Sequence, residues 1–147
     1  MNRIELEEYQ GKLQMSLMSA VGAESCRLLP SGWVCECKLI NGKEITIFVN
    51  ERTEAGFMDR IYTFSEDWMD YIKDLQGSAL IAIVQENKPE RLHLIDPEAP
   101  ELSGFSLSHS VDEFGTILYH YTKRDSYLAI SKRYESGMGT RSRGEKS

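Results

Sequence analysis

The clearest structural signal in the chain is Ser31-Gly-Trp-Val-Cys-Glu-Cys-Lys-Leu-Ile-Asn-Gly-Lys43. Alternate residues of 33–40 fall on two faces, Trp33, Cys35, Cys37 and Leu39 on one and Val34, Glu36, Lys38 and Ile40 on the other, which is the pattern of a half-buried β-strand. Glu36 and Lys38 therefore share one face of this strand. The Asn41-Gly42 pair that follows favours a type I′ hairpin turn, which needs positive φ at both positions. We predict a strand over 33–40, this turn, and a returning strand over 44–50.

Working outward, the first residues repeat apolar side chains at helical spacing as far as Gly22, which predicts a helix over 2–20. The Phe64-Ser65-Glu-Asp sequence is typical of a helix start. The remaining patterns predict further strands, helices and loops at these positions: a strand near 24–29, a loop over 51–63, a helix over 65–76, strands over 79–84 and 91–95, a long loop over 96–115, a strand over 116–122, and a short helix from 125.

This order of elements predicts an α+β fold, or a three-layer α/β/α fold, in which helices pack on a single mixed sheet. The domain is expected to span 1–136, and the Gly- and Ser-rich residues 137–147 are expected to form a flexible basic tail. The continuous apolar run over 79–84 predicts a central strand covered on both faces. Five side chains are expected in the core: Trp68, Ile72, Leu80, Ile83 and Val84.

Composition places the chain of 147 residues among ordinary globular proteins, with 41% hydrophobic and 27% charged residues and a net charge of −6. Residues 1–122 hold 10 basic and 20 acidic residues, whereas residues 123–147 hold 7 and 3. An acidic body disfavours a broad nucleic-acid surface, although the basic tail could contact a nucleic acid. No apolar run approaches the roughly 20 residues of a membrane helix, so no membrane association is expected.

The three cysteines, Cys26, Cys35 and Cys37, lack the spacing of a disulfide framework. Together with the acidic N-terminus, which does not read as a signal peptide, they predict a cytoplasmic location. Cys35 and Cys37 are too close in sequence for a common zinc knuckle. We expect all three to act as small buried hydrophobic residues.

The predicted element order and the Glu36-Cys37-Lys38 tripeptide, after a hydrophobic lead-in, resemble the restriction-endonuclease-like superfamily of PD-(D/E)xK nucleases. The resemblance covers residues 1–96 in element order, but its specific motif is one tripeptide. It implies a Mg²⁺-dependent nuclease in which Glu36 is a catalytic carboxylate that binds the metal and Lys38 is the catalytic lysine.

The chain departs from that pattern at the strand before the tripeptide. The family places an aspartate there, and this chain has Cys26, which is a poor ligand for a hard cation. Under the nuclease interpretation Glu24 would take its place, as a catalytic and metal-binding residue beside Glu36. The alternative is that Glu36 and Lys38 are simply a solvent-facing charged pair on an amphipathic strand.

Two other resemblances involve different residues. Leu118-Tyr-His-Tyr-Thr122 resembles the opening segment of ADP-ribosyltransferases, which implies that His120 contacts a nicotinamide ribose. However, too little chain follows for the later strands of that family. The acidic body and element order also resemble class I type III secretion chaperones, which bind extended segments of other proteins.

Because no catalytic set is complete, the sequence favours a small non-catalytic accessory, inhibitor or chaperone-like protein without a cofactor. We expect it to bind a protein partner, or a second copy of itself, through a sheet edge, the 96–115 loop or the tail. The alternative is a nuclease that uses Mg²⁺.

Overall fold

The computed structural model describes residues 2–74 and 78–124, which divide into two compact units. The larger unit contains residues up to 59 together with 69–97, and the smaller contains 60–68 and the residues from 98 onward. Each unit has its own sheet, five-stranded in the first and three-stranded in the second. The general α+β class is therefore confirmed, but the prediction of a single sheet is wrong.

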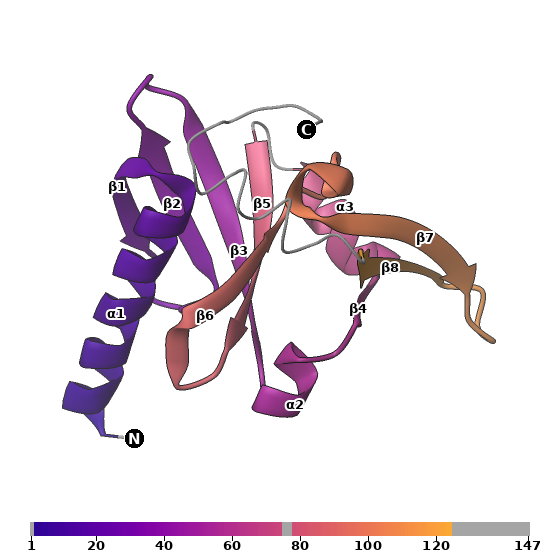
Figure 1. Cartoon of the computed structure of the whole chain (residues 1–147), viewed down its shortest axis with the longest axis horizontal. Coiled ribbons are helices and arrows are strands. Elements are labelled where there is room, and N and C mark those ends of the chain that lie inside the picture. Colours follow the sequence, from indigo (N-terminus) through magenta and orange to yellow (C-terminus); the bar gives the residue numbers. More distant parts are fainter. Residues whose placement is uncertain (1, 75–77, 125–147) are drawn as a thin grey trace. The chain divides into compact units, whose positions relative to one another are not determined.

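The five-stranded sheet has the order β1-β2-β3-β5-β6 (Figure 1). β1, β2 and β3 form an antiparallel meander, β5 then runs parallel to β3, and β6 returns antiparallel to β5. The strands occupy Ala23–Leu28 (β1), Val34–Leu39 (β2), Glu44–Arg52 (β3), Ser78–Gln85 (β5) and Lys88–Ile95 (β6). A sheet with β5 between β3 and β6 explains the apolar run that the sequence shows there.

Helix α1 (Arg3–Val21) lies along one face of this sheet (Figure 1). The Asn2 side chain caps its first turn by accepting the amide of Glu5 at 2.9 Å, and Gly22 ends it in the left-handed conformation. The helix and the sheet share a core of buried side chains: Leu13 and Leu17 from the helix, and Cys35, Cys37, Ile45, Ile47, Val49, Ala82 and Val84 from the strands. The predicted helix and the apolar face of the strand pair are thus confirmed.

The opposite face of the sheet is divided. Towards β5 it is apolar, with Phe48 and Ile81 paired in register and both buried. Helix α3 (Glu66–Asp74) contributes Tyr71, whose ring meets that of Phe48 edge-on with centroids 5.9 Å apart. Towards β1 the same face is polar and exposed.

Three of the five predicted core residues, Ile72, Ile83 and Val84, are buried. Trp68 and Leu80 are only half-buried. Leu80 lies near the start of β5, where burial is still incomplete, and Trp68 stacks on Phe64 at a centroid distance of 4.7 Å. A large apolar side chain at the end of an element can therefore keep part of its surface in solvent.

The hairpin between β2 and β3 is confirmed, but its turn is not type I′. The amide of Leu39 donates to the carbonyl of Lys43 at 2.8 Å, so the loop contains three residues, and only Gly42 has positive φ. A three-residue loop with glycine in the left-handed position is the next most common hairpin connection. The predicted strand pair is therefore correct, but the loop that joins it is one residue longer than predicted.

In the smaller unit, strands β4 (Ile61–Ser65), β7 (Phe105–Val111) and β8 (Ile117–Lys123) form an antiparallel sheet in the order β4-β8-β7. A 3₁₀ turn, η1 (Pro100–Ser103), precedes β7. One face carries the aromatic side chains Tyr62, Phe64 and Tyr121, all buried. The other face carries Thr63, His120 and Ser108 in one cross-strand row.

These elements correct the two predicted loops. Residues 51–63 contain the end of β3, the short helix α2 (Glu54–Phe57) and the start of β4, while residues 96–115 contain η1 and β7. Serine occupies every second position of β7. The segment was therefore interpreted as a loop from its small polar residues, although they alternate with larger side chains as in a strand. The predicted end of the second helix at 75–76, the helix from 125 and the tail 137–147 lie outside the described residues.

Candidate functional site on the open face of the sheet

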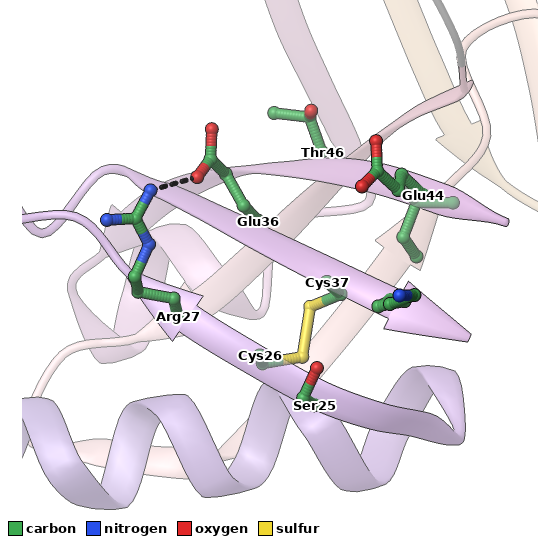
Figure 2. Close-up of a pocket in the computed structure, with 9 residues that line it drawn as sticks. Ser25, Cys26, Arg27, Glu36, Cys37, Glu44 and Thr46 are labelled. Atoms are coloured by element: carbon green, nitrogen blue, oxygen red, sulfur yellow. Dashed lines mark hydrogen bonds and ion pairs between the residues drawn. A yellow bond between two sulfur atoms is a disulfide. The ribbon is translucent and has the colours of Figure 1, made fainter. Parts of the chain in front are cut away.

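Glu36 and Lys38 lie on the side of β2 that faces away from α1, because alternate residues of that strand, Cys35 and Cys37, are committed to the core. They belong to what we call the open face, defined by Ser25, Arg27, Glu36, Lys38, Glu44 and Thr46. These side chains line a shallow concavity of about 300 Å³ over β1, β2 and β3. Figure 2 shows Glu36, Thr46 and Glu44 projecting from the strands on the side opposite the helix.

The register of the three strands sets which groups of the open face are neighbours. Glu36 lies directly between Arg27 on β1 and Thr46 on β3. One step along, Lys38 lies between Ser25 and Glu44. Each carboxylate therefore has a cation directly opposite it, and charges of opposite sign alternate over the face.

The two charged pairs differ in geometry. The guanidinium of Arg27 donates to the Glu36 carboxylate at 2.5 Å, with side chains that are 74% and 51% exposed. In the part of the chain that the structure describes, Lys38 and Glu44 form no ion pair although their backbones are paired. Arg27 and Glu36 are thus paired with each other, whereas the charges of Lys38 and Glu44 remain available to a ligand.

Glu24 is not brought to this site. The register of β1 shifts between Ala23 and Ser25, and this irregularity lies at Glu24. Glu24 is exposed and does not line the concavity. The carboxylate that shares the concavity with Glu36 is Glu44, which the sequence reasoning did not select.

Glu44 and Arg27 could have been found from the hairpin. Once β2 and β3 are joined by the three-residue loop after Leu39, residue 44 must oppose residue 38, whereas the predicted two-residue turn would place residue 44 opposite Leu39. Strand register, rather than a local motif, therefore identifies these two residues as part of the site. Taken singly, each is an ordinary charged residue near the end of a strand. The prediction of Arg27 additionally needs the position of the irregularity in β1.

The open face supplies only some of the oxygen ligands that a divalent metal ion needs. Glu36 and Glu44 occupy diagonal positions on neighbouring strands, for which the backbone separation is about 7–8 Å. Two flexible glutamates can meet on one ion across that span, but hard cations favour six or more oxygen ligands. In the described residues, no group of three metal-ligating side chains includes either glutamate.

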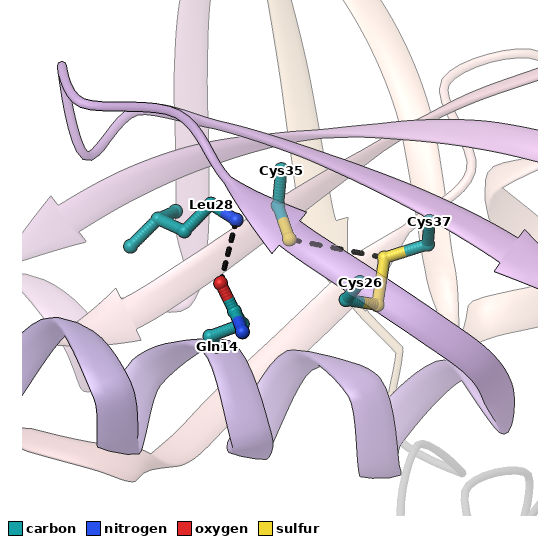
Figure 3. The surroundings of a disulfide bond; sticks show 5 residues. All are labelled: Gln14, Cys26, Leu28, Cys35 and Cys37. Atoms are coloured by element: carbon teal, nitrogen blue, oxygen red, sulfur yellow. Dashed lines mark hydrogen bonds between the residues drawn. A yellow bond between two sulfur atoms is a disulfide. The ribbon is translucent and has the colours of Figure 1, made fainter.

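The cysteines correct the expectation that all three act as small buried hydrophobic residues outside any disulfide. Cys26 on β1 and Cys37 on β2 are opposite each other and form a disulfide, and only Cys35 remains free (Figure 3). The disulfide was not predicted because Cys26 and Cys37 are 11 residues apart in sequence, and only the register of β1 and β2 shows that they face each other. Stable disulfides are typical of oxidising compartments, so the cytoplasmic location stays a prediction.

The surroundings of Cys35 make its thiol a weaker acid than usual. Its side chain is fully buried beneath α1. Burial raises the pKa of the Cys35 thiol to about 11, and the neighbouring Glu36 carboxylate adds to the rise. At neutral pH the group is therefore a protonated thiol rather than a nucleophilic thiolate.

His120, in the smaller unit, is held by two hydroxyl groups. Its Nδ1 lies 2.8 Å from Thr63 Oγ1, and its Nε2 lies 2.7 Å from Ser110 Oγ. Both ring nitrogens are occupied by neighbours on the adjacent strands, so the ring acts as a cross-strand link. A role in nicotinamide binding stays a prediction.

The chain matches no protein-family model, no curated protein and no solved structure. Among the described residues, no helix has both the length and the apolar character needed to cross a membrane.

Proposed function

We propose that this protein acts by binding another protein through the open face, without catalysing a reaction. The observation that carries the proposal is the alternation of charge across that face, in which Arg27 opposes Glu36 and Lys38 opposes Glu44. The partner that fits is a polar protein segment that presents one acidic and one basic side chain to Lys38 and Glu44.

The same alternation disfavours a nucleic-acid partner at this position. Phosphate groups are bound by clustered cations, whose counterions are released on binding. Here each cation of the open face stands beside a carboxylate, which would repel a phosphate. A basic tail at 137–147 as a nucleic-acid contact stays a prediction, since those residues lie outside the described part of the chain.

Complementary charges at a protein interface mainly set specificity and association rate. Reversing one of them should therefore weaken binding by like-charge repulsion. We expect Lys38→Glu and Glu44→Lys each to reduce recovery of a partner captured by the full chain from its native extract. Lys12→Glu, at an exposed position of α1, is the matched control and should leave recovery unchanged.

A photo-crosslinker placed at Thr46, which lines the same concavity and carries no charge, identifies what binds and where. A crosslinked protein that is lost in the Glu44→Lys variant supports the proposal. A crosslinked nucleic acid, or equal losses with Lys12→Glu, would overturn it. A crosslink only to a second copy of the chain would replace the proposed partner by a homo-oligomer.

A Mg²⁺-dependent nuclease remains the second candidate, because Glu36, Glu44 and Lys38 line one concavity. Two carboxylates on adjacent strands and a lysine are the groups that such chemistry needs. Under this interpretation Glu36→Ala, Lys38→Ala and Glu44→Ala each abolish Mg²⁺- or Mn²⁺-dependent cleavage of DNA or RNA. Glu24→Ala, the matched control at the strand irregularity, retains activity. Absence of cleavage by the parent protein with either metal removes this candidate.

A further inference from the structure

Among the described residues, the three cysteines form the group of side chains with ligand atoms close enough together to bind a single central atom. The Cys35 and Cys37 sulfurs are 3.8 Å apart, and all three sulfurs lie within 4.8 Å of one another. The strands enforce this meeting, because Cys35 and Cys37 are on the same face of β2 and Cys26 is the cross-strand partner of Cys37. Figure 3 shows the cluster beside α1, near Gln14.

We propose that, when the Cys26–Cys37 disulfide is reduced, the three sulfurs form a binding site for a trivalent soft metalloid, of which As(III) is the simplest probe. The oxidised chain is the closed state, since two of the three ligands are then bonded to each other. The proposal is independent of the function of the open face.

The spacing of the sulfurs suits one central atom. Bonds of about 2.3 Å between a metal and sulfur place ligand sulfurs roughly 4 Å apart. The Cys35 and Cys37 sulfurs, 3.8 Å apart, already have this spacing, and the Cys26 sulfur, which is bonded to Cys37 in the oxidised chain, reaches it by a small side-chain movement after reduction. Thiolate sulfur selects soft ions over Mg²⁺ or Ca²⁺.

The ligand count favours a three-coordinate centre. In the described part of the chain no histidine, aspartate or glutamate joins the three cysteines. Structural zinc almost always takes four ligands, so this set is one short for zinc. Trivalent arsenic forms three bonds to sulfur and needs no fourth ligand.

Charge balance favours the same ion. Cys35 and Cys37 are 0% and 3% exposed within an apolar core, where an uncompensated charge is costly. Zn²⁺ with three thiolates would leave one negative charge. Arsenous acid instead reacts as As(OH)₃ + 3 RSH → As(SR)₃ + 3 H₂O, which breaks three As–O bonds, forms three As–S bonds and leaves the site neutral.

The site also has an entrance. Cys26 is only half-buried, and β1 is an edge strand of the sheet. An ion can therefore reach Cys26 first and then transfer its other two bonds to Cys37 and Cys35. The Cys26–Cys37 disulfide must first be reduced, and a phosphine does this without adding a thiol that would compete for arsenic. The reaction is R₃P + R′SSR′ + H₂O → R₃PO + 2 R′SH.

The test uses the full chain reduced by a phosphine, desalted without oxygen and titrated with sodium arsenite. We expect one arsenic per chain by native mass spectrometry, with loss of three titratable thiols. Cys35→Ser keeps the disulfide but removes the third sulfur, and should weaken arsenite binding by at least about tenfold. Thr46→Ser, on the opposite face, is the matched control and should bind as the parent does.

Urea unfolding distinguishes a folded site from thiols of an unfolded chain. A ligand that binds the native state raises the unfolding midpoint, whereas one that binds the unfolded chain lowers it. We expect arsenite to raise the midpoint of the reduced protein. A lowered midpoint, equal binding by Cys35→Ser, equal binding by the oxidised protein, or stronger protection by Zn²⁺ would each overturn the proposal.

Discussion

The two faces of β1, β2 and β3 are built from the same short strands, yet they have opposite properties. On one face, residues such as Ile47 and Cys35 are fully buried against α1. On the other, one residue away in sequence, Thr46 and Glu36 line an open concavity. Strand alternation thus lets one segment supply both a core and a polar open face, and we expect adjacent positions to differ greatly in their tolerance to mutation.

The largest difference should come from the same substitution at two neighbouring positions of β3. Ile47→Asp places an unpaired carboxylate in the core under α1, and the protein should fail to fold. Thr46→Asp adds a charge to the exposed face and should stay within about 1 kcal/mol of the parent. Circular dichroism and urea unfolding measure both. Similar melting of the two variants would mean that the face assignment is wrong.

A smaller effect separates the two sides of α1. Leu17 is fully buried over the sheet, so Leu17→Ala should lower the free energy of unfolding by about 2–5 kcal/mol through lost burial and a cavity. Met15 on the same helix is 60% exposed, and Met15→Ala should change stability by about 0.5 kcal/mol or less. Chemical denaturation tests both, and equal losses would show that α1 packs differently.

The disulfide between β1 and β2 should contribute about 3 kcal/mol if the chain-entropy estimate for a short loop applies. Cys26→Ala should be destabilised by about that amount relative to the oxidised parent. After reduction by a phosphine the two proteins should unfold at nearly the same denaturant concentration. A parent whose stability does not respond to reduction would show that the bond is not formed.

The smallest effect is expected on the open face itself. The exposed Arg27–Glu36 ion pair should couple by at most about 1 kcal/mol. A double-mutant cycle of Arg27→Ala and Glu36→Ala measures this coupling, which should fall in high salt. The matched cycle of Lys38→Ala and Glu44→Ala should give a smaller value. A salt-independent coupling of several kcal/mol would mean that the face is covered in solution.

Sequence patterns predicted the parts of the fold that depend on local repetition. The 3.6-residue spacing of α1, the alternation of β2 and β3 and the apolar run of β5 were all correct in kind. The patterns failed where composition and structure disagree. The serine-rich β7 resembled a loop, and the short β4 was hidden between polar residues, so the second sheet was missed.

The candidate site was predicted only in part, and for a related reason. Glu36 and Lys38 belong to one strand, so alternation alone placed them on one face. Glu44 and Arg27 join them through register, which depends on the loop after Leu39 and on the irregularity beside Glu24. A one-residue change at either place would bring different residues to the site, and no motif in the sequence records it.

Gln14 caps one backbone amide at the β1 edge of the sheet. Its side-chain oxygen accepts the amide of Leu28 at 2.8 Å (Figure 3), which is a position that a neighbouring strand would otherwise occupy. Edge strands with free amides recruit strands from other chains and so promote aggregation. A helical side chain that accepts this amide occupies one hydrogen-bonding position of the edge, and it therefore disfavours the addition of a further strand at that point of β1.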